Sequence, residues 1–480
     1  MKFEIFRPYD IRGHWLLDFD EQDVVAICMG FLAYFKSLDR TSRKIVVGRD
    51  ARPSSKVIYD ICVNIAVQQG FEVLGLGLCT TPMVNIAYHF DESCKFRVMI
   101  TASHNPWTHN GFKLFYKETA VWRNALLEVA SFVEKVALDG ESVCVSRGGG
   151  LIDATYLLEA YQLTLEQAFR ALPGQSMSFL VDCMHGAAGF MFRKVIEKVA
   201  GLKASFFRDT PYCDLLSSET SALLGPDPSN EANLTATVLE LRKQKLSFAM
   251  LFDGDADRFV VVLANGKILS GDEILALFAE KFLPEGESFA ANVASSVLLE
   301  LVAARNGQFV QRVPVGVAVL KETMRVDGIA LGGEPSAHFL FLKEHFCVDD
   351  ALFAAYKFLC VCAFPTFMLE VWCQNLPVVY STPIQKYFFA SREKVLDTQA
   401  FLAQKFNGMG YRISKIDGIR IFFADHAWIL MRASNTENCL SLRIEADTLE
   451  MFKEVKKFFM RELVSILSPE PACLEKESLS

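Results

Sequence analysis

The segment FDGDADRF, residues 252–259, places three carboxylates at alternate positions. These are the side chains of Asp253, Asp255 and Asp257. The apolar runs FAMLF and FVVVL flank the segment, which predicts a loop between two strands. Three carboxylates this close repel one another unless a cation neutralises them. The segment therefore predicts a cation site, with a solvated acidic loop as the alternative.

Mg²⁺ fits this loop better than Ca²⁺. An EF-hand loop starting at Asp253 would need glycine at its sixth position and glutamate at its twelfth, where the chain has Arg258 and Ala264. Mg²⁺ is commonly held by a few carboxylates and completes its shell with water or phosphate oxygens. We therefore expect Mg²⁺ at this loop.

A serine, Ser103, follows the apolar run FRVMIT of residues 96–101. The run is predicted to be a strand, which puts Ser103 at the edge of a sheet where ligands bind in α/β folds. A serine hydroxyl at such a place needs a neighbouring base or a metal to react. The hydrolase pattern G-x-S-x-G is absent, because Ala102 and His104 flank the serine. An ordinary acyl-transfer serine is thus disfavoured, and a simple turn is the alternative.

Two later segments could bind a phosphorylated sugar. In GGEPSAH, residues 332–338, the side chains of Glu334, Ser336 and His338 alternate and would share one face of an extended segment. A carboxylate beside a hydroxyl can bind sugar hydroxyls. RASNTE, residues 432–437, begins with Arg432, which can clamp a phosphate with two hydrogen bonds. Its small donors are Ser434, Asn435 and Thr436. Taken singly, the two segments are also compatible with a polar hairpin and an ordinary turn.

The elements that must position these residues alternate between short β-rich runs and longer helical stretches. Residues 44–50 and 71–77 read as strands around a helix at 54–70, which is the pattern of a parallel sheet. The pattern restarts near 178 and 288. Residues 418–446 instead read as three strands joined by short turns, followed by a helix over 447–464, which predicts a separate α+β domain. The predicted domains are 1–150, 151–265, 266–372 and 373–467, followed by a disordered tail at 468–480.

Composition excludes several classes of protein. The chain has 480 residues, of which 51% are hydrophobic and 22% charged, so it is predicted to be globular. Its formal net charge is −8 and it has no stripe rich in Lys and Arg, which argues against nucleic-acid binding. The longest apolar run, residues 358–369, is too short to cross a bilayer. The thirteen cysteines include no C-x-x-C pair, and the N-terminus has no apolar signal core, so we expect reduced thiols in a cytoplasmic protein.

Five motifs in this order resemble the α-D-phosphohexomutase superfamily, of the phosphomannomutase/phosphoglucomutase type. They are FRPYDIRG at 6–13, TASHNP at 101–106, DGDADR at 253–258, GGEPSAH at 332–338 and RASNTE at 432–437. The resemblance implies three related α/β domains with mixed sheets and a smaller C-terminal α+β domain around a central cleft. It also implies that a phosphoryl group on Ser103 is transferred to a hexose phosphate. The resulting hexose 1,6-bisphosphate turns over in the site, returns its other phosphate to Ser103, and also serves as activator.

The resemblance assigns roles to the candidate residues. Ser103, Asp253, Asp255 and Asp257 would bind Mg²⁺ through the phosphoserine and the carboxylates. Arg258 would stabilise the charge of the transferred group, and Lys113 and His104 would handle protons. Arg12 and Tyr9 would line the site, and Arg432, Ser434, Asn435 and Thr436 would hold the phosphate that is not transferred. Glu334, Ser336 and His338 form the sugar-binding loop. The family's Glu and Ser contact O3 and O4, so mannose and glucose, which differ only at O2, would both be accepted.

The chain departs from the family pattern at several positions. Asn438 follows the phosphate-binding loop where proline is usual, and Ala337 replaces a common glycine. Val317 stands where some bacterial members have a phosphate-contacting histidine, and NVASS at 292–296 lacks their lysine. These departures bear on sugar preference more than on the reaction class.

Other functions remain open. Phosphoglucosamine mutases resemble the chain less, because it lacks their FGTDGIRG opening and RxSGTEP ending. A haloacid-dehalogenase-type phosphatase would use Asp253 as nucleophile with Asp349 and Asp350 as a metal pair, but it requires Thr or Val at the position of Asp257. A non-catalytic sugar-phosphate sensor is the third alternative. Hexose phosphates are the expected partners, no membrane is expected, and a monomer is expected with a dimer as the alternative.

Overall fold

The computed structural model describes residues 1–139, 148–172, 176–215, 225–434, 437–462 and 466. The chain forms two compact units. The first consists of Met1–Lys281 and Gly316–Leu369, and the second of Phe282–Val315 and Glu370–Ser480. The predicted disordered tail at 468–480 lies outside the described residues, and so do Asn435 and Thr436.

The first sheet of the first unit has seven strands. Its order is β1 (Ile11–His14), β5 (His109–Tyr116), β4 (Phe96–Ile100), β2 (Lys44–Arg49), β3 (Glu72–Leu78) and β7 (Gly150–Ile152), with β6 (Thr119–Ala120) beside β5. Strand β2 pairs in parallel with β3 and β4, whereas β5 pairs antiparallel with β1 and β4. The sheet is therefore mixed, as predicted.

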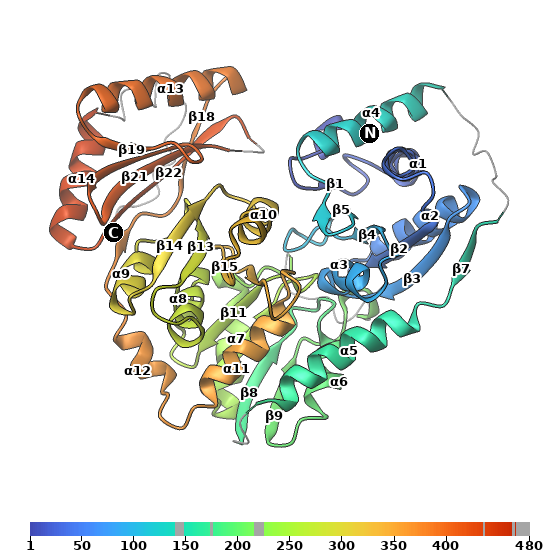
Figure 1. Cartoon of the computed structure of the whole chain (residues 1–480), viewed down its shortest axis with the longest axis horizontal. Coiled ribbons are helices and arrows are strands. Elements are labelled where there is room, and N and C mark those ends of the chain that lie inside the picture. Colours follow the sequence, from blue (N-terminus) through green and yellow to red (C-terminus); the bar gives the residue numbers. More distant parts are fainter. Residues whose placement is uncertain (140–147, 173–175, 216–224, 435–436, 463–465, 467–480) are drawn as a thin grey trace. The chain divides into compact units, whose positions relative to one another are not determined.

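Helices cover both faces of this sheet (Figure 1). On one face, α1 (Glu21–Leu38), α2 (Ser55–Gln68) and α4 (Asn124–Asp139) share a core with Ile45 and Val47 of β2. On the other face, α3 (Thr81–Phe90) packs against β2 and β4. Thr80 caps α3 by accepting a hydrogen bond from the amide of Met83. Burial on both faces explains why every residue of β4 is buried.

The second sheet of the first unit carries the aspartate segment. Its order is β12 (Ile268–Leu269), β11 (Phe259–Leu263), β10 (Phe248–Phe252), β8 (Met177–Asp182) and β9 (Leu202–Phe207). Strands β10 and β11 form a fully buried antiparallel hairpin, which fixes the loop between them. The helices that accompany this sheet are α5 (Thr155–Arg170), α6 (Gly189–Ile196) and α7 (Glu231–Gln244). Helix α8 (Gly271–Phe282) follows β12, and its Phe278 ring packs against Phe339 and Phe341.

The rest of the first unit is a short hairpin with two helices. Strands β15 (Leu331–Gly333) and β16 (Phe339–Phe341) pair antiparallel and enclose the predicted sugar-binding loop. Helix α10 (Val317–Asp327) precedes the hairpin and α11 (Ala351–Cys362) follows it. Two short 3₁₀ helices, η1 (Phe3–Ile5) and η2 (Tyr212–Asp214), complete this unit.

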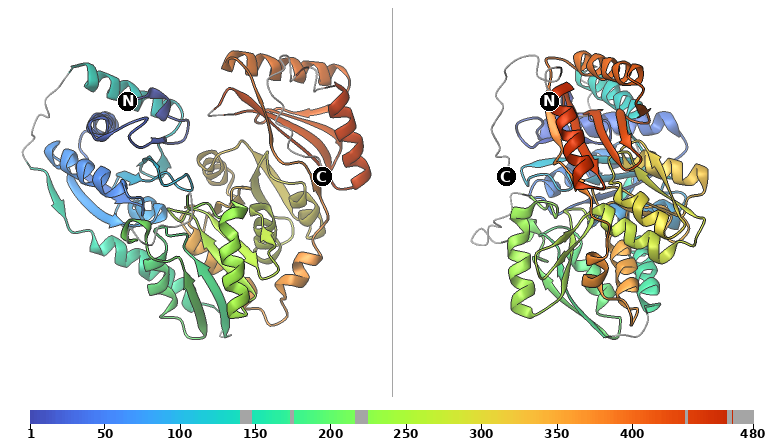
Figure 2. Two further views of the ribbon diagram at one scale, coloured as in Figure 1. Left: turned by 180° about the vertical axis from the view of Figure 1, so that it is seen from behind. Right: turned by 90° about the vertical axis from the view of Figure 1, so that its left-hand side faces the viewer.

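The second unit contains a parallel pair and an antiparallel sheet. Strands β13 (Ser288–Asn292) and β14 (Phe309–Val313) pair in parallel and are joined through α9 (Leu298–Arg305). After α12 (Leu369–Gln374) the chain forms a six-stranded sheet. Its order is β17 (Tyr380–Ser381), β22 (Cys439–Ala446), β21 (Ala427–Ala433), β20 (Ile419–Ala424) and β19 (Arg412–Ser414), with β18 (Gln385–Phe388) beside β22. Helices α13 (Arg392–Gly408) and α14 (Leu449–Glu462) share one core with this sheet (Figure 2).

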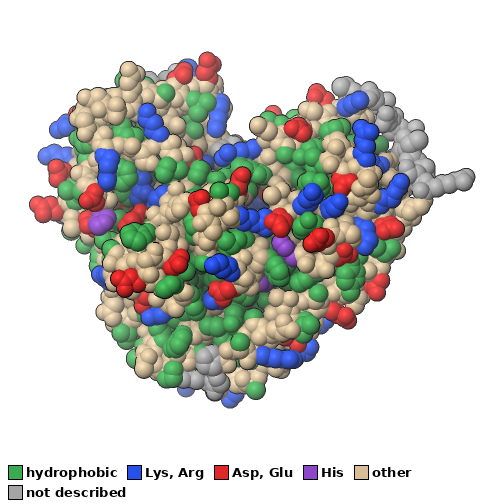
Figure 3. Space-filling view, in the orientation of Figure 1, with side chains coloured by type: hydrophobic (Ala, Val, Ile, Leu, Met, Phe, Trp, Pro, Cys, Tyr) green, Lys and Arg blue, Asp and Glu red, His purple; other side chains and the backbone are tan. Residues whose placement is uncertain are grey.

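The predicted fold class is confirmed: mixed α/β sheets are followed by a C-terminal α+β sheet. The third predicted domain, 266–372, contributes to both units. Among the described helices, none combines the length and apolar character needed to cross a bilayer. On the face drawn in Figure 3, basic and acidic side chains are interspersed rather than segregated.

Candidate active site

Ser103 lies directly after β4 in a strained backbone conformation. Its φ of 51° is in the left-handed region, which residues other than glycine rarely adopt. The amide of Ser103 donates to Thr101 Oγ1 at 2.8 Å, and the Ser103 hydroxyl donates to Asp253 Oδ2 at 2.7 Å. His104 Nδ1 lies 3.2 Å from the same hydroxyl. The loop thus directs the serine at the first aspartate of the hairpin loop.

The three aspartates of the β10–β11 loop are buried together. One oxygen from each of Asp253, Asp255 and Asp257 lies within 4.8 Å of the others. Burial, together with the two neighbouring carboxylates, raises the pKa of Asp253 well above its ordinary value. Asp255 Oδ1 is buried and accepts no hydrogen bond within the described part of the chain. A buried carboxylate oxygen in this state suits a bound cation, so the residues present fit Mg²⁺.

Lys113 of β5 is the principal positive charge against this cluster. Its Nζ donates to Asp255 Oδ2 at 2.7 Å and to Asp257 Oδ2 at 2.5 Å. Burial opposes its charge, but the two carboxylates outweigh burial and raise the pKa of Lys113 above its ordinary value. Burial by itself would raise the pKa of Asp257, but Lys113 and His338 hold this pKa well below its usual range. Lys113 is therefore an ammonium ion in this arrangement.

Two arginines flank the serine and the aspartates. Arg258 Nε lies 3.8 Å from Asp253 Oδ2. Arg12 Nη1 donates to Asn105 Oδ1 at 3.1 Å, and Arg12 also pairs with Asp10. Burial, reinforced by both arginines, lowers the pKa of His104 far below its ordinary value, so the imidazole is neutral. The side chains around the serine thus combine two guanidinium groups with a neutral imidazole.

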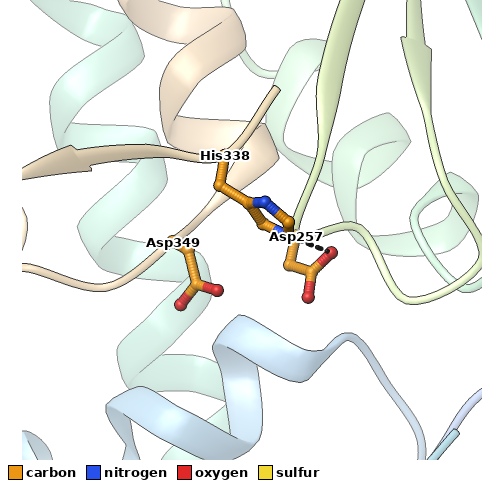
Figure 4. Close-up of side chains that lie close together, drawn as sticks. All are labelled: Asp257, His338 and Asp349. Atoms are coloured by element: carbon orange, nitrogen blue, oxygen red, sulfur yellow. Dashed lines mark ion pairs between the residues drawn. The ribbon is translucent and has the colours of Figure 1, made fainter. Parts of the chain in front are cut away.

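The β15–β16 turn contributes three of the predicted residues. Ser336 Oγ lies 2.9 Å from His338 Nδ1, and His338 Nε2 lies 3.4 Å from Asp257 Oδ1. Figure 4 shows the His338 ring beside Asp257, with the Asp349 carboxylate facing the same space. Burial and the charge of Asp257 raise the pKa of Asp349 to about 6. Glu334 Oε1 accepts a hydrogen bond of 2.8 Å from an amide at the start of α10.

Tyr9 lies near this turn. Its ring stacks on Trp122 with ring centres 6.2 Å apart. The same ring contacts Gly316, because a Cβ built there would lie 2.8 Å from its atoms. The first unit therefore brings together every sequence-predicted residue that it contains: Ser103, His104, Lys113, Arg12, Arg258, Tyr9, Glu334, Ser336, His338 and the three aspartates.

The predicted phosphate-binding residues belong to the second unit. Arg432 lies near the end of β21 and its Nε donates to Asp417 Oδ2 at 2.7 Å. Ser434 Oγ accepts a hydrogen bond of 3.2 Å from the amide of Glu437. Asn435 and Thr436 fall outside the described residues.

The phosphatase alternative finds little support in the geometry of Asp349 and Asp350. Asp350 caps α11 by accepting hydrogen bonds from the amides of Leu352 and Phe353. It also accepts a hydrogen bond of 3.0 Å from the Tyr161 hydroxyl. Asp349, in contrast, has a carboxylate oxygen within 4.8 Å of ligand atoms of Asp257 and His338, so the two adjacent carboxylates have different partners (Figure 4).

Sequence reasoning missed two neighbours of the site. Thr81, at the start of α3, donates its hydroxyl to Asp255 Oδ2 at 2.5 Å. Arg52 is fully buried and bonds to the backbone of the Ser103 loop. The signal for Arg52 was the charged segment GRDAR, residues 48–52, which covers the end of β2 and the residues after it, at the same sheet edge as Ser103. Thr81 carries no comparable signal, since its partner lies 174 residues away.

Four domain families match consecutive parts of the chain. They are the phosphoglucomutase/phosphomannomutase alpha/beta/alpha domains I, II and III, at residues 4–136, 156–266 and 270–378, and the C-terminal domain at 388–462.

Two curated relatives align with nearly the whole chain. A phosphoglucomutase from Neisseria meningitidis is 30% identical over 461 residues, which cover 95% of this chain and 96% of the relative. A phosphomannomutase/phosphoglucomutase from Pseudomonas aeruginosa is 28% identical, with 97% of each chain covered. Among solved structures, a phosphoglucomutase/phosphomannomutase family protein from Burkholderia thailandensis superposes with a TM-score of 0.83 at 23% identity. That alignment covers 97% of this chain and 98% of the other, and it shows a shared fold.

Proposed function

Since the chain belongs to the phosphoglucomutase/phosphomannomutase family, within the α-D-phosphohexomutase superfamily, we propose that it interconverts hexose 1-phosphate and hexose 6-phosphate. The sugar is mannose, glucose or both, and the intermediate is a hexose 1,6-bisphosphate. One observation carries the proposal: the Ser103 hydroxyl lies 2.7 Å from Asp253, the first residue of a buried three-aspartate cluster.

In the forward step the phosphoserine P–O bond breaks and a new P–O bond forms to the free hydroxyl of the hexose phosphate. The hydroxyl proton leaves to a base beside the serine, and Ser103 regains its hydroxyl once a proton is delivered to its oxygen. The return step runs the same exchange with the other phosphate of the bisphosphate. Atoms and charges balance without any further reactant.

The residues of the chain divide this work. Arg258 and Arg12 stabilise negative charge on the transferred group. Lys113 and His104 are the proposed proton donor and acceptor, because Lys113 is bonded to Asp255 and Asp257 and His104 lies beside the Ser103 hydroxyl. Mg²⁺ on Asp253, Asp255 and Asp257 would neutralise charge that develops during transfer.

Sugar binding is proposed for the β15–β16 turn. Glu334, Ser336 and His338 present a carboxylate, a hydroxyl and an imidazole on one turn, which suits pairs of sugar hydroxyls. Arg432 and Ser434, with Asn435 and Thr436, are proposed to bind the distal phosphate. The expected location of the protein is the cytoplasm.

A labelling experiment tests the proposal. Wild-type protein incubated with Mg²⁺ and ³²P-labelled glucose 1,6-bisphosphate should acquire acid-stable label at Ser103, and the Ser103→Ala variant should acquire none. An alkali-labile acyl phosphate on Asp253 would instead indicate phosphatase chemistry. Failure to convert glucose 1-phosphate, despite Mg²⁺ and the bisphosphate, would favour a sugar-phosphate sensor. Values of kcat/KM for mannose, glucose and glucosamine 1-phosphates, measured side by side, would assign the sugar.

A further inference from the structure

Arg52 lies between β2 and α2, fully buried, and it is bonded to the loop that carries Ser103. Its guanidinium donates to four backbone carbonyls of that loop. The acceptors are Ser103 O at 2.6 Å, Asn105 O at 2.8 Å, Pro106 O at 2.5 Å and His109 O at 3.0 Å. The remaining donor, Nε, bonds Asp50 Oδ2 at 3.0 Å. All three guanidinium nitrogens are therefore engaged, and only one of their bonds goes to a side chain.

This arrangement suits arginine and not lysine. Arginine presents five N–H donors in a planar, rigid fork, whereas lysine presents three donors on a single nitrogen. A lysine at position 52 could not reach all four carbonyls from its single nitrogen. Pro106 O would keep the His109 amide as a donor at 2.9 Å, but the guanidinium fork that bonds both Ser103 O and Asn105 O would be lost. Because a buried carbonyl without a donor is unfavourable, the loop would rearrange to find other partners.

Other residues also pack closely against this loop. A Cβ added to Gly225 would lie 2.8 Å from Asn105 O, and one added to Gly254 would lie 2.7 Å from Ser103 O. The Trp107 ring stacks on Tyr212 with centres 4.2 Å apart. The loop is therefore in contact with the Arg52 guanidinium and with loops of the second sheet of the first unit.

We propose that Arg52 is a positioning residue for the reaction, which fixes the loop backbone so that Ser103 Oγ points at the aspartate cluster. It acts through the backbone, because its donors are bonded to carbonyls and to Asp50. The inference rests on the proposed role of Ser103 as the phosphoryl carrier. It extends that proposal by assigning a function to a buried charge whose hydrogen bonds go to the loop backbone and to Asp50.

Arg97 offers a matched control. It is also fully buried, and its guanidinium donates to the backbone carbonyls of Cys94, Lys95 and Lys117. It lies near the start of β4, whereas Ser103 follows the end of that strand. The Arg52→Lys and Arg97→Lys variants therefore remove the same kind of buried bond between a guanidinium and backbone carbonyls. In Arg52→Lys the affected backbone follows the end of β4, and in Arg97→Lys it lies near the start of β4.

The first readout is steady-state turnover of glucose 1-phosphate. For Arg52→Lys we expect kcat to fall about 100-fold, because a displacement near 1 Å at a reacting group costs that much. KM should stay within about twofold, because the guanidinium is occupied by the loop and not by substrate. Arg97→Lys should keep kcat within about twofold. A kcat for Arg52→Lys within threefold of wild type, or an equal loss in Arg97→Lys, overturns the proposal.

The second readout does not depend on turnover. Hydrogen–deuterium exchange of the peptide covering residues 101–110 should become at least tenfold faster in Arg52→Lys and stay unchanged in Arg97→Lys. If the wild-type protein proves inactive, the proposed function fails, but the exchange comparison still decides whether Arg52 holds the loop. Unchanged exchange in Arg52→Lys refutes the inference. Should Arg52→Lys not fold, Asp50→Asn replaces it. This near-isosteric change removes the negative charge that pairs with the guanidinium Nε and also accepts a hydrogen bond from Thr101, so it should lower kcat about tenfold at constant KM. Wild-type turnover in Asp50→Asn would equally refute the inference.

Discussion

Replacing Gly254 by alanine tests how closely the aspartate loop must approach the serine loop. A Cβ at this position would lie 2.7 Å from both the Ser103 carbonyl oxygen and Pro226 Cγ. Ordinary contact begins at 3.4 Å, so the two loops must separate by a large part of the 0.7 Å difference. The distance from Ser103 Oγ to Asp253 Oδ2, now 2.7 Å, changes with them.

The size of the effect follows from this displacement. Because a misplacement of about 1 Å costs roughly 100-fold in rate, we expect kcat of Gly254→Ala to fall about 20-fold. Overpacking of this kind also destabilises a fold by about 1–3 kcal/mol, which a thermal melt would register. KM for the sugar phosphate should change little, because glycine contributes no side chain to the sugar-binding turn.

The assay is mutase turnover of glucose 1-phosphate with Mg²⁺ and glucose 1,6-bisphosphate. Gly150→Ala is the control: it lies in β7 of the same unit, and a Cβ there would have no heavy atom within 4 Å. The control should match wild type in both kcat and melting temperature. A Gly254→Ala protein with wild-type kcat would refute the argument that the approach of the two loops sets the reactive geometry.

Three further predictions concern the cation site and stability. Removal of divalent ions with EDTA should abolish turnover, and added Mg²⁺ should restore it. The Asp257→Asn variant should need an Mg²⁺ concentration at least about tenfold higher for half-maximal rate. Activity that survives EDTA would contradict the proposed cation site. Thr81→Val removes the hydroxyl bonded to Asp255 at 2.5 Å and should weaken Mg²⁺ activation about tenfold, with little change in melting temperature. An unchanged Mg²⁺ titration would mean that Thr81 serves the structure of helix α3 and not the cation site. Burial lowers the pKa of the half-buried His89 from 6.5 to about 4. As pH falls, His89 is therefore protonated in the unfolded chain before it is protonated in the folded one, and the fold loses stability between pH 6.5 and 4. The full shift corresponds to about 3 kcal/mol, which partial exposure reduces to roughly 1 kcal/mol. His89→Gln should therefore lose less stability than wild type in urea melts between pH 7 and 4, and parallel losses would exclude His89 as the cause.

Local sequence patterns predicted those parts of the site that are formed by residues close together in the sequence. The strand before Ser103 and the hairpin around Asp253 were readable, because apolar runs ending in polar residues mark the ends of buried strands. The segment carrying Glu334 was interpreted as extended, with a polar hairpin as the alternative, and the structure shows the hairpin, whose turn joins β15 to β16.

The contacts that sequence reasoning missed join distant parts of the chain. Arg52 is 51 residues from Ser103, and its carbonyl partners have no side-chain signature in the sequence. Lys113 was identified only as a proton-handling group, whereas its bonds to Asp255 and Asp257 span more than 140 residues. Such pairings arise from how sheets pack together, which no periodicity of one segment encodes. The division of the third predicted domain between two compact units was unforeseen for the same reason.

The discontinuous first unit has a consequence for how the protein is made. Residues Met1–Lys281 are synthesised before Gly316–Leu369, so the nascent chain carries the complete aspartate loop before its last neighbours are made. His338 follows Asp257 by 81 positions (338 − 257). At about 5–20 residues per second, this interval lasts roughly 4–16 seconds. During that time the three carboxylates lack the His338 imidazole, which lies 3.4 Å from Asp257 Oδ1 in the finished fold. The site reaches its final composition only when one of the last segments of the unit folds back onto structure that formed earlier.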